Sequence, residues 1–526
     1  MMERPNAVFI NGEAVQLCEY IKDRLYFVTI ASRKEPKSTA DIHFFSIDDE
    51  LVYSNYYNDF GPLNLGCLYR YCVKLNTKLK CFSLGKKQII HYTSTDPQKR
   101  ANAAFLIASF SVIYLKMTPK QAYKPLMSDK YRLFRPFQDA SIGASEYHIY
   151  MVDCLDGIYR ALQHGFFNFE DFDLEEYERY EKIEYGDLNW IIPNKFLAFC
   201  GPSNETNTSY KPPEHYINYF KQNDVSTIIR LNRKTYNSRS FTKAGFNHYD
   251  LYFVDGSVPS LTLANKFLEI CESVTGAIAV HCKAGLGRTG SLIGTYMMKH
   301  YRMTARECIA WLRICRPGSV IGRQQAWLEE MQGVFWRSGD IYRVRRHGDG
   351  DCIPRHTYGI YSIVARKNKE GLQNLDLLPQ QIVPYNFNVE RLNTGNCLKH
   401  LLGRTLPENQ SMDDYASVPN HGKKCLNKKS RLNPFNRYNN QQGIVNNRCF
   451  DSPCQCIPVP IPRKMHTIQS GRSNFMEHSK NINLCDPSGF VNNLVSSPQM
   501  TQGDRLNAIK IIRAKQGAGD KMNIGK

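Results

Sequence analysis

Apolar residues form short β-prone runs that alternate with helical patterns along the first 340 positions. Runs with the length and composition of strands occupy residues 27–30, 43–47, 89–92, 226–231 and 248–253. Residues 101–115 form a longer, almost uninterrupted apolar run, which is typical of a buried helix. The alternation predicts an α/β fold.

Part of this pattern occurs twice. Residues 106–126 align without a gap with residues 292–312 when the numbering is shifted by 186. The identical pairs are Leu106/Leu292, Ile107/Ile293, Met117/Met303, Thr118/Thr304 and Leu126/Leu312. Chance similarity of two apolar helices is the alternative, but we interpret the first half as a second copy of the domain in the second half.

A glycine-bearing loop stands before the second of these helices. The apolar run 277–280 leads into HCKAGLGRTG, residues 281–290, and a helical pattern follows. Strand, loop and helix N-terminus in this order favour a bound anion, because backbone N–H groups and the helix dipole are directed at it. The same surroundings favour the thiolate of Cys282, which is the nucleophilic form. Gly285 and Gly287 allow the N–H groups to turn toward the anion.

Arg288 lies six residues after Cys282 and offers a planar fork that matches two phosphate oxygens. Thr289 can donate a hydrogen bond to the sulfur. A buried structural cysteine is the alternative, and the placement of the glycines and the arginine argues against it. The loop therefore predicts phosphoryl transfer to Cys282.

The Cys-x5-Arg spacing resembles the signature of protein tyrosine and dual-specificity phosphatases, and the longer loop with its neighbours resembles the Cdc14 family of cell-cycle phosphatases. The resemblance implies an α/β fold with two tandem dual-specificity-phosphatase-like domains, a linker helix and a long disordered basic tail. We expect a non-catalytic domain over residues 1–165, an acidic linker helix over 166–190, a catalytic domain over 191–340 and a basic, mostly disordered tail over 341–526. The phosphate-binding residues that it implies are Lys283, Ala284, Gly285, Leu286, Gly287, Arg288 and Thr289.

The first copy lacks the residues that the reaction needs. The shift of 186 places Asp96 at the position of Cys282 and Asn102 at that of Arg288. Because this copy has neither the nucleophile nor the phosphate fork, we expect it to be structural.

Asp255 precedes a glycine in a segment that follows the predicted strand 248–253, 27 residues before Cys282. This segment resembles the family's general-acid loop. A carboxyl group there can protonate the leaving oxygen and then activate water. A turn-forming Asp-Gly without a catalytic role is the alternative.

Two adjacent glutamines, Gln324 and Gln325, follow the second repeated helix. In the family, a glutamine in this region orients the water that hydrolyses phosphocysteine, and the resemblance favours Gln324. Arg323 departs from the family pattern, in which proline is more common, and this weakens the choice between the two glutamines.

The predicted linker carries Glu178, Glu181 and Asp187 in acidic and aromatic sequence. On composition alone, a solvated helix is the favoured interpretation. The resemblance implies instead that these three residues bind basic residues of the substrate that follow the phosphosite.

Charge distinguishes the tail from the rest of the chain. The net charge is +19, and +14 of it lies from residue 341 onward, where 27 Lys and Arg stand against 13 Asp and Glu. Five basic residues form either a nuclear localisation signal or a solvated charge run: Lys423, Lys424, Lys428, Lys429 and Arg431. No aromatic residues are interleaved with these lysines, which argues against a nucleic-acid partner.

A bound metal and a membrane span are not expected. Cys449, Cys454 and Cys456 lack a second pair at zinc-ligand spacing, so we predict no metal and no cofactor. No apolar run is long enough to span a bilayer. Seventeen cysteines without a secretory signal favour reduced thiols in the cytosol or nucleus.

Three interpretations of the substrate remain. The resemblance implies a phosphatase that acts on phosphoserine or phosphothreonine before proline, with a basic residue nearby, and on phosphotyrosine. Such an enzyme would reverse phosphorylation by proline-directed, cyclin-dependent kinases in cell-cycle control, mitotic exit or cytokinesis. The alternatives are an inositol-lipid phosphatase and a scaffold without turnover.

The loop favours a phosphoprotein substrate. Leu286 stands where loops that act on lipids carry a second lysine, so Lys283 is the only additional cation, and a polyanionic headgroup is disfavoured. The resemblance also implies a location in the nucleus, nucleolus and cytoplasm, with the centrosome or spindle as further sites.

Overall fold

A computed structural model describes residues 7–372 and 500–523, apart from residues 11, 33, 130, 132, 144 and 205–209. The described residues belong to one compact unit, formed by residues 1–377 and 485–526. The predicted localisation signal, the three cysteines considered for zinc and most of the predicted disordered tail lie outside the described residues.

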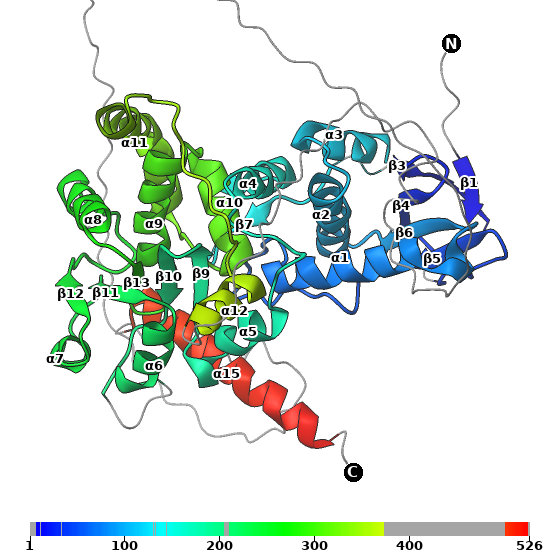
Figure 1. The fold of residues 1–526 in the computed structure, drawn as a ribbon. Helices are drawn as coiled ribbons and strands as arrows, with labels where there is room; N and C mark the ends of the chain where they lie inside the picture. Colours follow the sequence, from blue (N-terminus) through cyan, green and yellow to red (C-terminus); the bar gives the residue numbers. More distant parts are fainter. Residues whose placement is uncertain are drawn as a thin grey trace, which may run out of the picture. The chain divides into compact units, whose positions relative to one another are not determined.

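The first half contains a mixed sheet covered by helices (Figure 1). Its strand order is β3-β4-β6-β5, with β3 antiparallel to β4 and the other neighbours parallel. The strands are β3 (Cys18–Ile21), β4 (Leu25–Ile30), β5 (Ile42–Phe45) and β6 (Gln88–Ser94), and the helices are α1 (Leu65–Lys80), α2 (Pro97–Ile113), α3 (Pro119–Tyr123) and α4 (Met151–Gln163). Two strand pairs accompany them, β1 (Ala7–Ile10) with β2 (Glu13–Gln16) and β7 (Phe137–Gln138) with β8 (His148–Ile149). Helix α2 is buried on every side from Arg100 to Ile113, as its apolar run predicts.

The second half contains the sheet that positions the loop. Its strand order is β12-β11-β13-β10-β9, and β13 is central, with parallel neighbours on both sides and all five residues buried. The strands are β9 (Leu188–Ile192), β10 (Phe196–Phe199), β11 (Val225–Arg230), β12 (Asn247–Asp250) and β13 (Ala277–His281). The helices are α6 (Glu214–Gln222), α7 (Arg239–Thr242), α8 (Leu261–Ser273), α9 (Gly287–Tyr301), α10 (Ala305–Cys315) and α11 (Arg323–His347).

One predicted strand is too long. We expected a strand over residues 248–253, but regular pairing with β11 ends at Asp250. Leu251 N still donates to the carbonyl oxygen of Arg230, the last residue of β11, and Phe253 N to that of Leu231, so the chain leaves the sheet edge gradually and enters the loop that carries Asp255.

The two halves repeat one topology, which confirms the prediction of two related domains. The order β3-β4-β6-β5 corresponds to β9-β10-β13-β11, with one antiparallel and two parallel pairings in each. Lys116 and Arg302, which are 186 positions apart, both have a left-handed backbone, with φ of 57° and 53°. Thr118 and Thr304, at the same shift, each form a capping box at the start of the next helix.

The first copy has lost the loop itself. Only Thr95 and Asp96 separate β6 from α2, whereas five residues separate β13 from α9. Asp96 is the N-cap of α2, and its Oδ1 accepts hydrogen bonds from Gln98 N and Lys99 N in the first turn of that helix. A two-residue connection cannot surround an anion, so this copy lacks both the chemical groups and the space.

Helices also occur in the linker and in the predicted tail. In the linker, α5 (Leu174–Glu181) and a 3₁₀ turn, η3 (Ile183–Tyr185), occupy less than the expected 166–190, because β9 already begins at Leu188. Beyond residue 340, α11 continues to His347, and α12 (Ile363–Leu372) and α15 (Gln502–Asn523) follow. The expectation of a mostly disordered tail did not include these helices.

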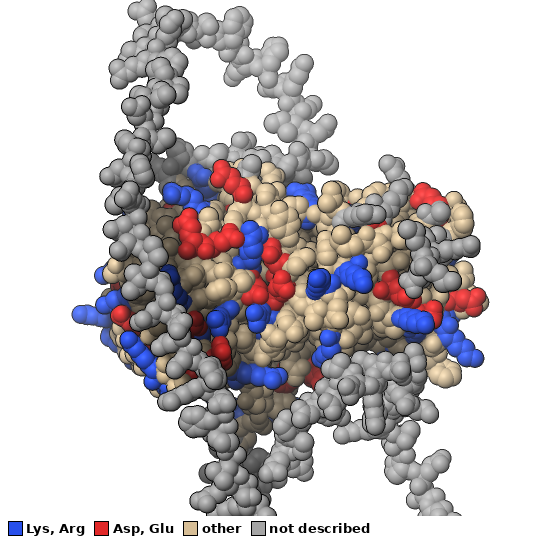
Figure 2. Space-filling view, turned by 90° about the horizontal axis from the view of Figure 1, so that it is seen from above, with Lys and Arg blue, Asp and Glu red and all other residues tan. Residues whose placement is uncertain are grey.

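The described surface is mixed in charge. On the face drawn in Figure 2, acidic and basic side chains are interspersed, and no continuous basic stripe crosses the described residues of that face. None of the described helices is long and apolar enough to cross a membrane.

Candidate active site

The loop between β13 and α9 has its carbonyl groups turned outward. The carbonyl oxygen of Lys283 accepts a hydrogen bond from Gly201 N at 3.0 Å. Those of Ala284 and Gly285 accept from Arg316 Nη2 at 3.0 Å and Nε at 2.8 Å. Because the C=O and N–H of a trans peptide point in opposite directions, the following N–H groups are directed to the inner side of the loop. The backbone therefore has the form of an anion-binding cradle.

Gly285 is required by the close packing of this cradle. Its φ is +68°, and a Cβ at this position would lie 2.0 Å from the Phe199 carbonyl oxygen in β10. No side chain larger than hydrogen fits without displacing the strand.

Cys282 follows β13 directly and is nearly enclosed, with 3% of its surface exposed. His281 fixes the start of the loop, because its Nδ1 donates to the Cys282 carbonyl oxygen at 3.0 Å and its Nε2 accepts from the Tyr236 hydroxyl at 2.8 Å. Burial lowers the pKa of His281 to about 3, so the ring is neutral at pH 7. His281 therefore positions the predicted nucleophile and is not a candidate for proton transfer.

Arg288, in the first turn of α9, faces the same space. Its Nη1 donates to the Phe253 carbonyl oxygen at 3.0 Å, and its Nη2 lies 3.1 Å from Asp255 Oδ1. Its Nε is buried without a hydrogen-bond partner among the described residues, and so is Thr289 Oγ1. Two buried polar groups of this kind, next to inward N–H groups, fit the oxygens of a phosphate.

Asp255 reaches the site from the segment after β12. One carboxylate oxygen contacts Arg288, and the other accepts from Gly503 N of α15 at 2.8 Å. Lys283 is directed toward α15, where its Nζ lies 3.0 Å from Asp504 Oδ1. Leu286 is fully buried in an apolar cluster. The structure thus brings the predicted acid and the predicted loop together, while the loop's lysine and leucine face α15.

Gln324 lies against the loop, whereas Gln325 does not. Gln324 Nε2 donates to the Ser257 carbonyl oxygen at 3.1 Å, and its Oε1 would be 2.7 Å from a Cβ on Gly287. Gln325 Oε1 instead accepts from the buried Arg313 at 2.5 Å. Gln324 therefore lies between the nucleophile loop and the segment of Asp255.

The first half supports this glutamine segment. Asp139, which follows β7, accepts from Gly322 N at 2.7 Å and from the hydroxyl groups of Ser141 and Ser145. Burial opposes its charge, but Arg313 and these hydrogen bonds lower the pKa of Asp139 below its ordinary value. The first half thus supplies a buried carboxylate to the start of α11.

Two of the three predicted acidic residues line a large cavity. This cavity, of about 680 Å³, is bounded by the first half, the linker, Arg316 and α15, and Glu181 and Asp187 are in its wall. Glu178 is not among the lining residues, because both its oxygens bind Arg70 of α1 at 2.7 Å. Glu184, which we did not predict, does line the cavity.

Glu181 and Asp187 differ in their surroundings. Burial raises the pKa of Glu181, although Asn64 and the Tyr177 hydroxyl donate to it. Burial acts the same way on Asp187, but the charges of Arg316 and Lys510 outweigh it and lower the pKa of Asp187. Asp187 is therefore the carboxylate of this wall that is already bound to cations.

Sequence reasoning missed Arg316 and α15. Arg316 binds main-chain carbonyls, and such contacts leave no pattern in a sequence. Helix α15 did leave a signal: Thr501-x-x-Asp504 is a capping sequence, and Leu506 and Ile509 follow at helical spacing.

Comparison with known proteins agrees with this geometry. The family described as "Dual specificity protein phosphatase, N-terminal half" matches residues 19–161, and "Dual specificity phosphatase, catalytic domain" matches residues 209–333. Dual specificity protein phosphatase CDC14B of Mus musculus is 50% identical over 395 residues, which cover 74% of this chain and 80% of that protein. This chain belongs to the Cdc14 family of dual specificity protein phosphatases.

Other members of the Cdc14 family are more similar but longer. Dual specificity protein phosphatase CDC14A of Mus musculus is 59% identical over 337 residues, and that of Homo sapiens is 58% identical over 373 residues. These alignments cover 63% and 70% of this chain, and 56% and 62% of the relatives. The chain thus matches less than two thirds of the length of these two relatives.

Proposed function

We propose that this chain hydrolyses phosphoserine and phosphothreonine that precede proline, and phosphotyrosine, through a phosphocysteine at Cys282. One observation carries the proposal: Arg288 Nε and Thr289 Oγ1 are buried without partners in the described part of the chain, beside a loop whose carbonyls are turned outward. A phosphate group would satisfy them. The printed names of the relatives, dual specificity protein phosphatases, support the same chemistry.

The reaction has two steps. In the first, the Cys282 sulfur attacks phosphorus, Arg288 and the loop N–H groups bind the phosphate oxygens, and the bond to the substrate oxygen breaks while Asp255 gives that oxygen a proton. In the second, Gln324 orients a water molecule and Asp255 takes its proton, so that the water oxygen bonds to phosphorus. The sulfur–phosphorus bond then breaks and releases phosphate and the Cys282 thiolate. Both steps use the side chains named, the loop N–H groups and water.

The proposed substrates are phosphoproteins modified by proline-directed, cyclin-dependent kinases. Asp187 and Glu181 would bind a Lys or Arg that follows the phosphosite, and the ion pair between Asp187 and Lys510 supports this, because it places a cation in that position. Leu286 gives the loop no second cation beside Lys283, which disfavours a polyanionic inositol lipid. We further propose a role in cell-cycle control, mitotic exit or cytokinesis, in the nucleus and cytoplasm.

A substrate panel tests this proposal on the full chain. The panel contains phosphoserine-proline peptides with and without a downstream lysine, their phosphothreonine and phosphotyrosine forms, and a phosphoinositide. We expect turnover of the peptides, preference for the lysine peptide, and no turnover by Cys282→Ser. Turnover of the phosphoinositide alone would contradict the proposal.

Variants of the acidic wall test the recognition of the lysine. In Asp187→Asn and Glu181→Gln, the ratio of kcat/KM between the lysine peptide and the lysine-free peptide should fall. Glu175→Gln, on the exposed side of α5, is the matched control. An unchanged ratio in both wall variants would show that these carboxylates do not recognise the substrate.

A further inference from the structure

Helix α15 lies against the catalytic loops, although more than 100 residues separate it from the rest of the described chain (Figure 1). At its first turn, Gly503 N donates to Asp255 Oδ2 at 2.8 Å, and Asp504 lies 3.0 Å from Lys283 Nζ. One turn later, Asn507 Nδ2 donates to the Lys283 carbonyl oxygen at 3.3 Å. The N-terminal end of α15 thus contacts both the predicted acid and the nucleophile loop.

The apolar side of α15 is buried in the same place. Leu506 and Ile509 are 1% and 2% exposed and share a cluster with Leu286 of the loop. The cluster also contains Tyr56 and Ala140 of the first half. Apolar contact accompanies the polar contacts, which is typical of a specifically bound segment.

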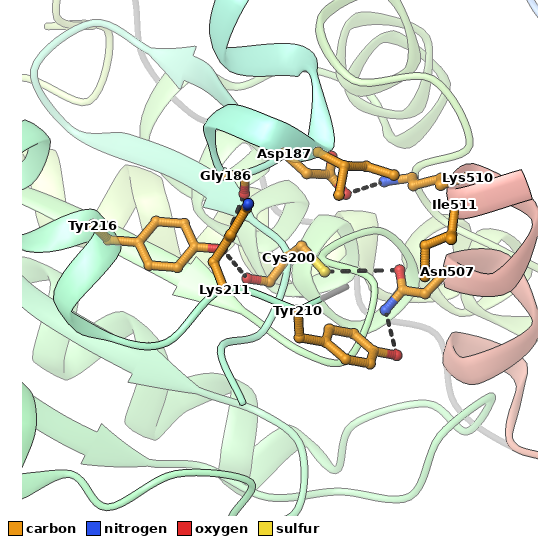
Figure 3. Close-up of a pocket in the computed structure, with 10 residues that line it drawn as sticks. Gly186, Asp187, Cys200, Tyr210, Lys211, Tyr216, Asn507, Lys510 and Ile511 are labelled. Carbon is orange, nitrogen blue, oxygen red and sulfur yellow. Dashed lines mark hydrogen bonds and ion pairs between the residues drawn. The ribbon is translucent and has the colours of Figure 1, made fainter. Parts of the chain in front are cut away.

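The basic side of α15 is directed at the acidic wall. Figure 3 shows Lys510 pointing to Asp187, with Nζ 2.6 Å from Oδ2. Burial opposes the charge of Lys510, but Asp187 outweighs it, so the pKa of Lys510 is raised and the side chain is a cation. One turn later, the Arg513 guanidinium lies 5.5 Å from the centre of the Tyr56 ring. Lys510 therefore stands where the proposed function places the basic residue of a substrate.

We infer that α15 is an intrachain inhibitor that covers the loop after β13 and the cavity wall with Asp187, and that a phosphoprotein must displace it. This inference rests on the proposed function. While α15 is bound, it hinders two parts of that function: proton transfer by Asp255 and binding of the substrate's basic residue. Gly503 N of α15 donates to Asp255 Oδ2, while Oδ1 lies 3.1 Å from Arg288 Nη2, so α15 occupies the carboxylate oxygen that does not face Arg288. Asp187 is paired with Lys510, so a basic residue of the substrate competes with α15 for one carboxylate.

Two variants of the full chain detach the helix. Leu506→Asp with Ile509→Asp places charges in the apolar cluster, and Lys510→Glu places like charges together at Asp187. Lys515→Glu is the matched control, because it makes the same charge change on an exposed position of the same helix. The readouts are turnover of an aryl phosphate and of the lysine peptide, and the rate at which iodoacetate alkylates Cys282.

We expect both variants to raise turnover about tenfold or more and to speed alkylation, while Lys515→Glu resembles the unmodified chain. A tenfold rise corresponds to a bound state favoured about ten to one over the open state. A synthetic peptide of residues 500–515, added to the double variant, should raise KM and leave kcat unchanged.

The inference would be overturned if the variants are alkylated faster but cleave no phosphate ester faster than the unmodified chain does. In that case α15 would leave the loop without any gain in activity. Unchanged alkylation and turnover in both variants would also overturn it. Inhibition that grows with protein concentration would assign the contact to a second copy of the chain and not to the same molecule. If no variant cleaves any phosphate ester but alkylation is faster, the proposed function fails and the contact of α15 with the loop stands.

Discussion

Arg316 offers the most direct test of how the loop is organised. Its guanidinium, 2% exposed, donates to the carbonyl oxygens of Ala284 and Gly285, to Asn189 Oδ1 at 2.8 Å, and lies 2.9 Å from Asp187. Arg316→Lys keeps the charge but replaces a planar fork by a single ammonium group. An ammonium that stays with Asp187 cannot also reach both loop carbonyls on the other side of the fork.

The magnitude follows from the contacts that are lost. A hydrogen bond from a charged group contributes about 1.5–3 kcal/mol, so losing the two loop contacts should lower the free energy of unfolding by about 3 kcal/mol or more. Without them the loop N–H groups are no longer held inward. Since loss of one oriented donor at a developing charge costs about 10²–10³ in kcat, we expect kcat of Arg316→Lys to fall about 100-fold.

The assay separates positioning from stability. Aryl phosphate turnover and the pre-steady-state burst report phosphoryl transfer, and urea unfolding reports stability, with Arg345→Lys on the exposed end of α11 as control. A large loss of stability with normal kcat would show that Arg316 only stabilises the fold. Normal values of both would refute the argument that the outward carbonyls depend on this side chain.

Three further predictions concern single positions. Gly285→Ala should abolish turnover, because the new Cβ would collide with β10. Gly245→Ala is the control, since φ there is also positive (+97°) but no atom lies within 4 Å of a new Cβ, and it should lower the free energy of unfolding by only about 1–2 kcal/mol. Equal effects of the two substitutions would contradict the steric argument. Asp139→Asn should slow hydrolysis of the phosphocysteine more than its formation, seen as a larger burst relative to the steady rate, and a parallel loss in both steps would indicate general damage. Folding lowers the pKa of His281 from 6.5 to about 3, so between these pH values the unfolded chain binds a proton at His281 that the folded chain does not. The free energy of unfolding should therefore fall as the pH falls, by about 1.4 kcal/mol per pH unit. In urea unfolding between pH 6 and 4, His281→Gln should reduce the dependence of the free energy of unfolding on pH by about this amount. His347→Gln, at an exposed position, should not reduce it. An unchanged pH dependence in both variants would contradict the buried, neutral state of His281.

The elements whose structure depends on neighbouring residues in the sequence were predictable. The run 277–280 and the loop that follows it carry their structure in adjacent residues, and both fold as expected. The repeated segment 292–312 was expected to be one helix, but the left-handed backbone at Arg302 divides it into α9 and α10. The boundaries were less predictable, because β12 ends and β9 begins where pairing with neighbouring strands dictates. Asp139 and Arg316 were not predictable, since their partners are backbone groups far away in the sequence.

The sequence of the first copy predicted that it has no catalytic site, but not that it contacts the site of the second copy. Replacement of the nucleophile and arginine positions indicated a copy without catalysis, and the two-residue connection at Thr95 and Asp96 agrees with that reading. The sequence did not indicate that this half still reaches the site. Tyr56, Asp139 and Ala140 all do so, which makes the first half part of the wall around the catalytic loop.

Leu286 connects the choice of substrate with the docking of α15. It is fully buried between Tyr56 and Ala140 of the first half and Leu506 and Ile509 of α15. A lysine at this position would give the loop the second cation that suits a lipid headgroup, but its charge would be buried among these apolar side chains at a cost of several kcal/mol. We therefore expect Leu286→Lys to release α15, so that alkylation of Cys282 becomes faster and the synthetic peptide of residues 500–515 no longer inhibits. If that peptide still inhibits Leu286→Lys as it inhibits the double variant, the apolar cluster does not hold the helix, and the polar contacts to Asp255 and Asp187 alone account for its position.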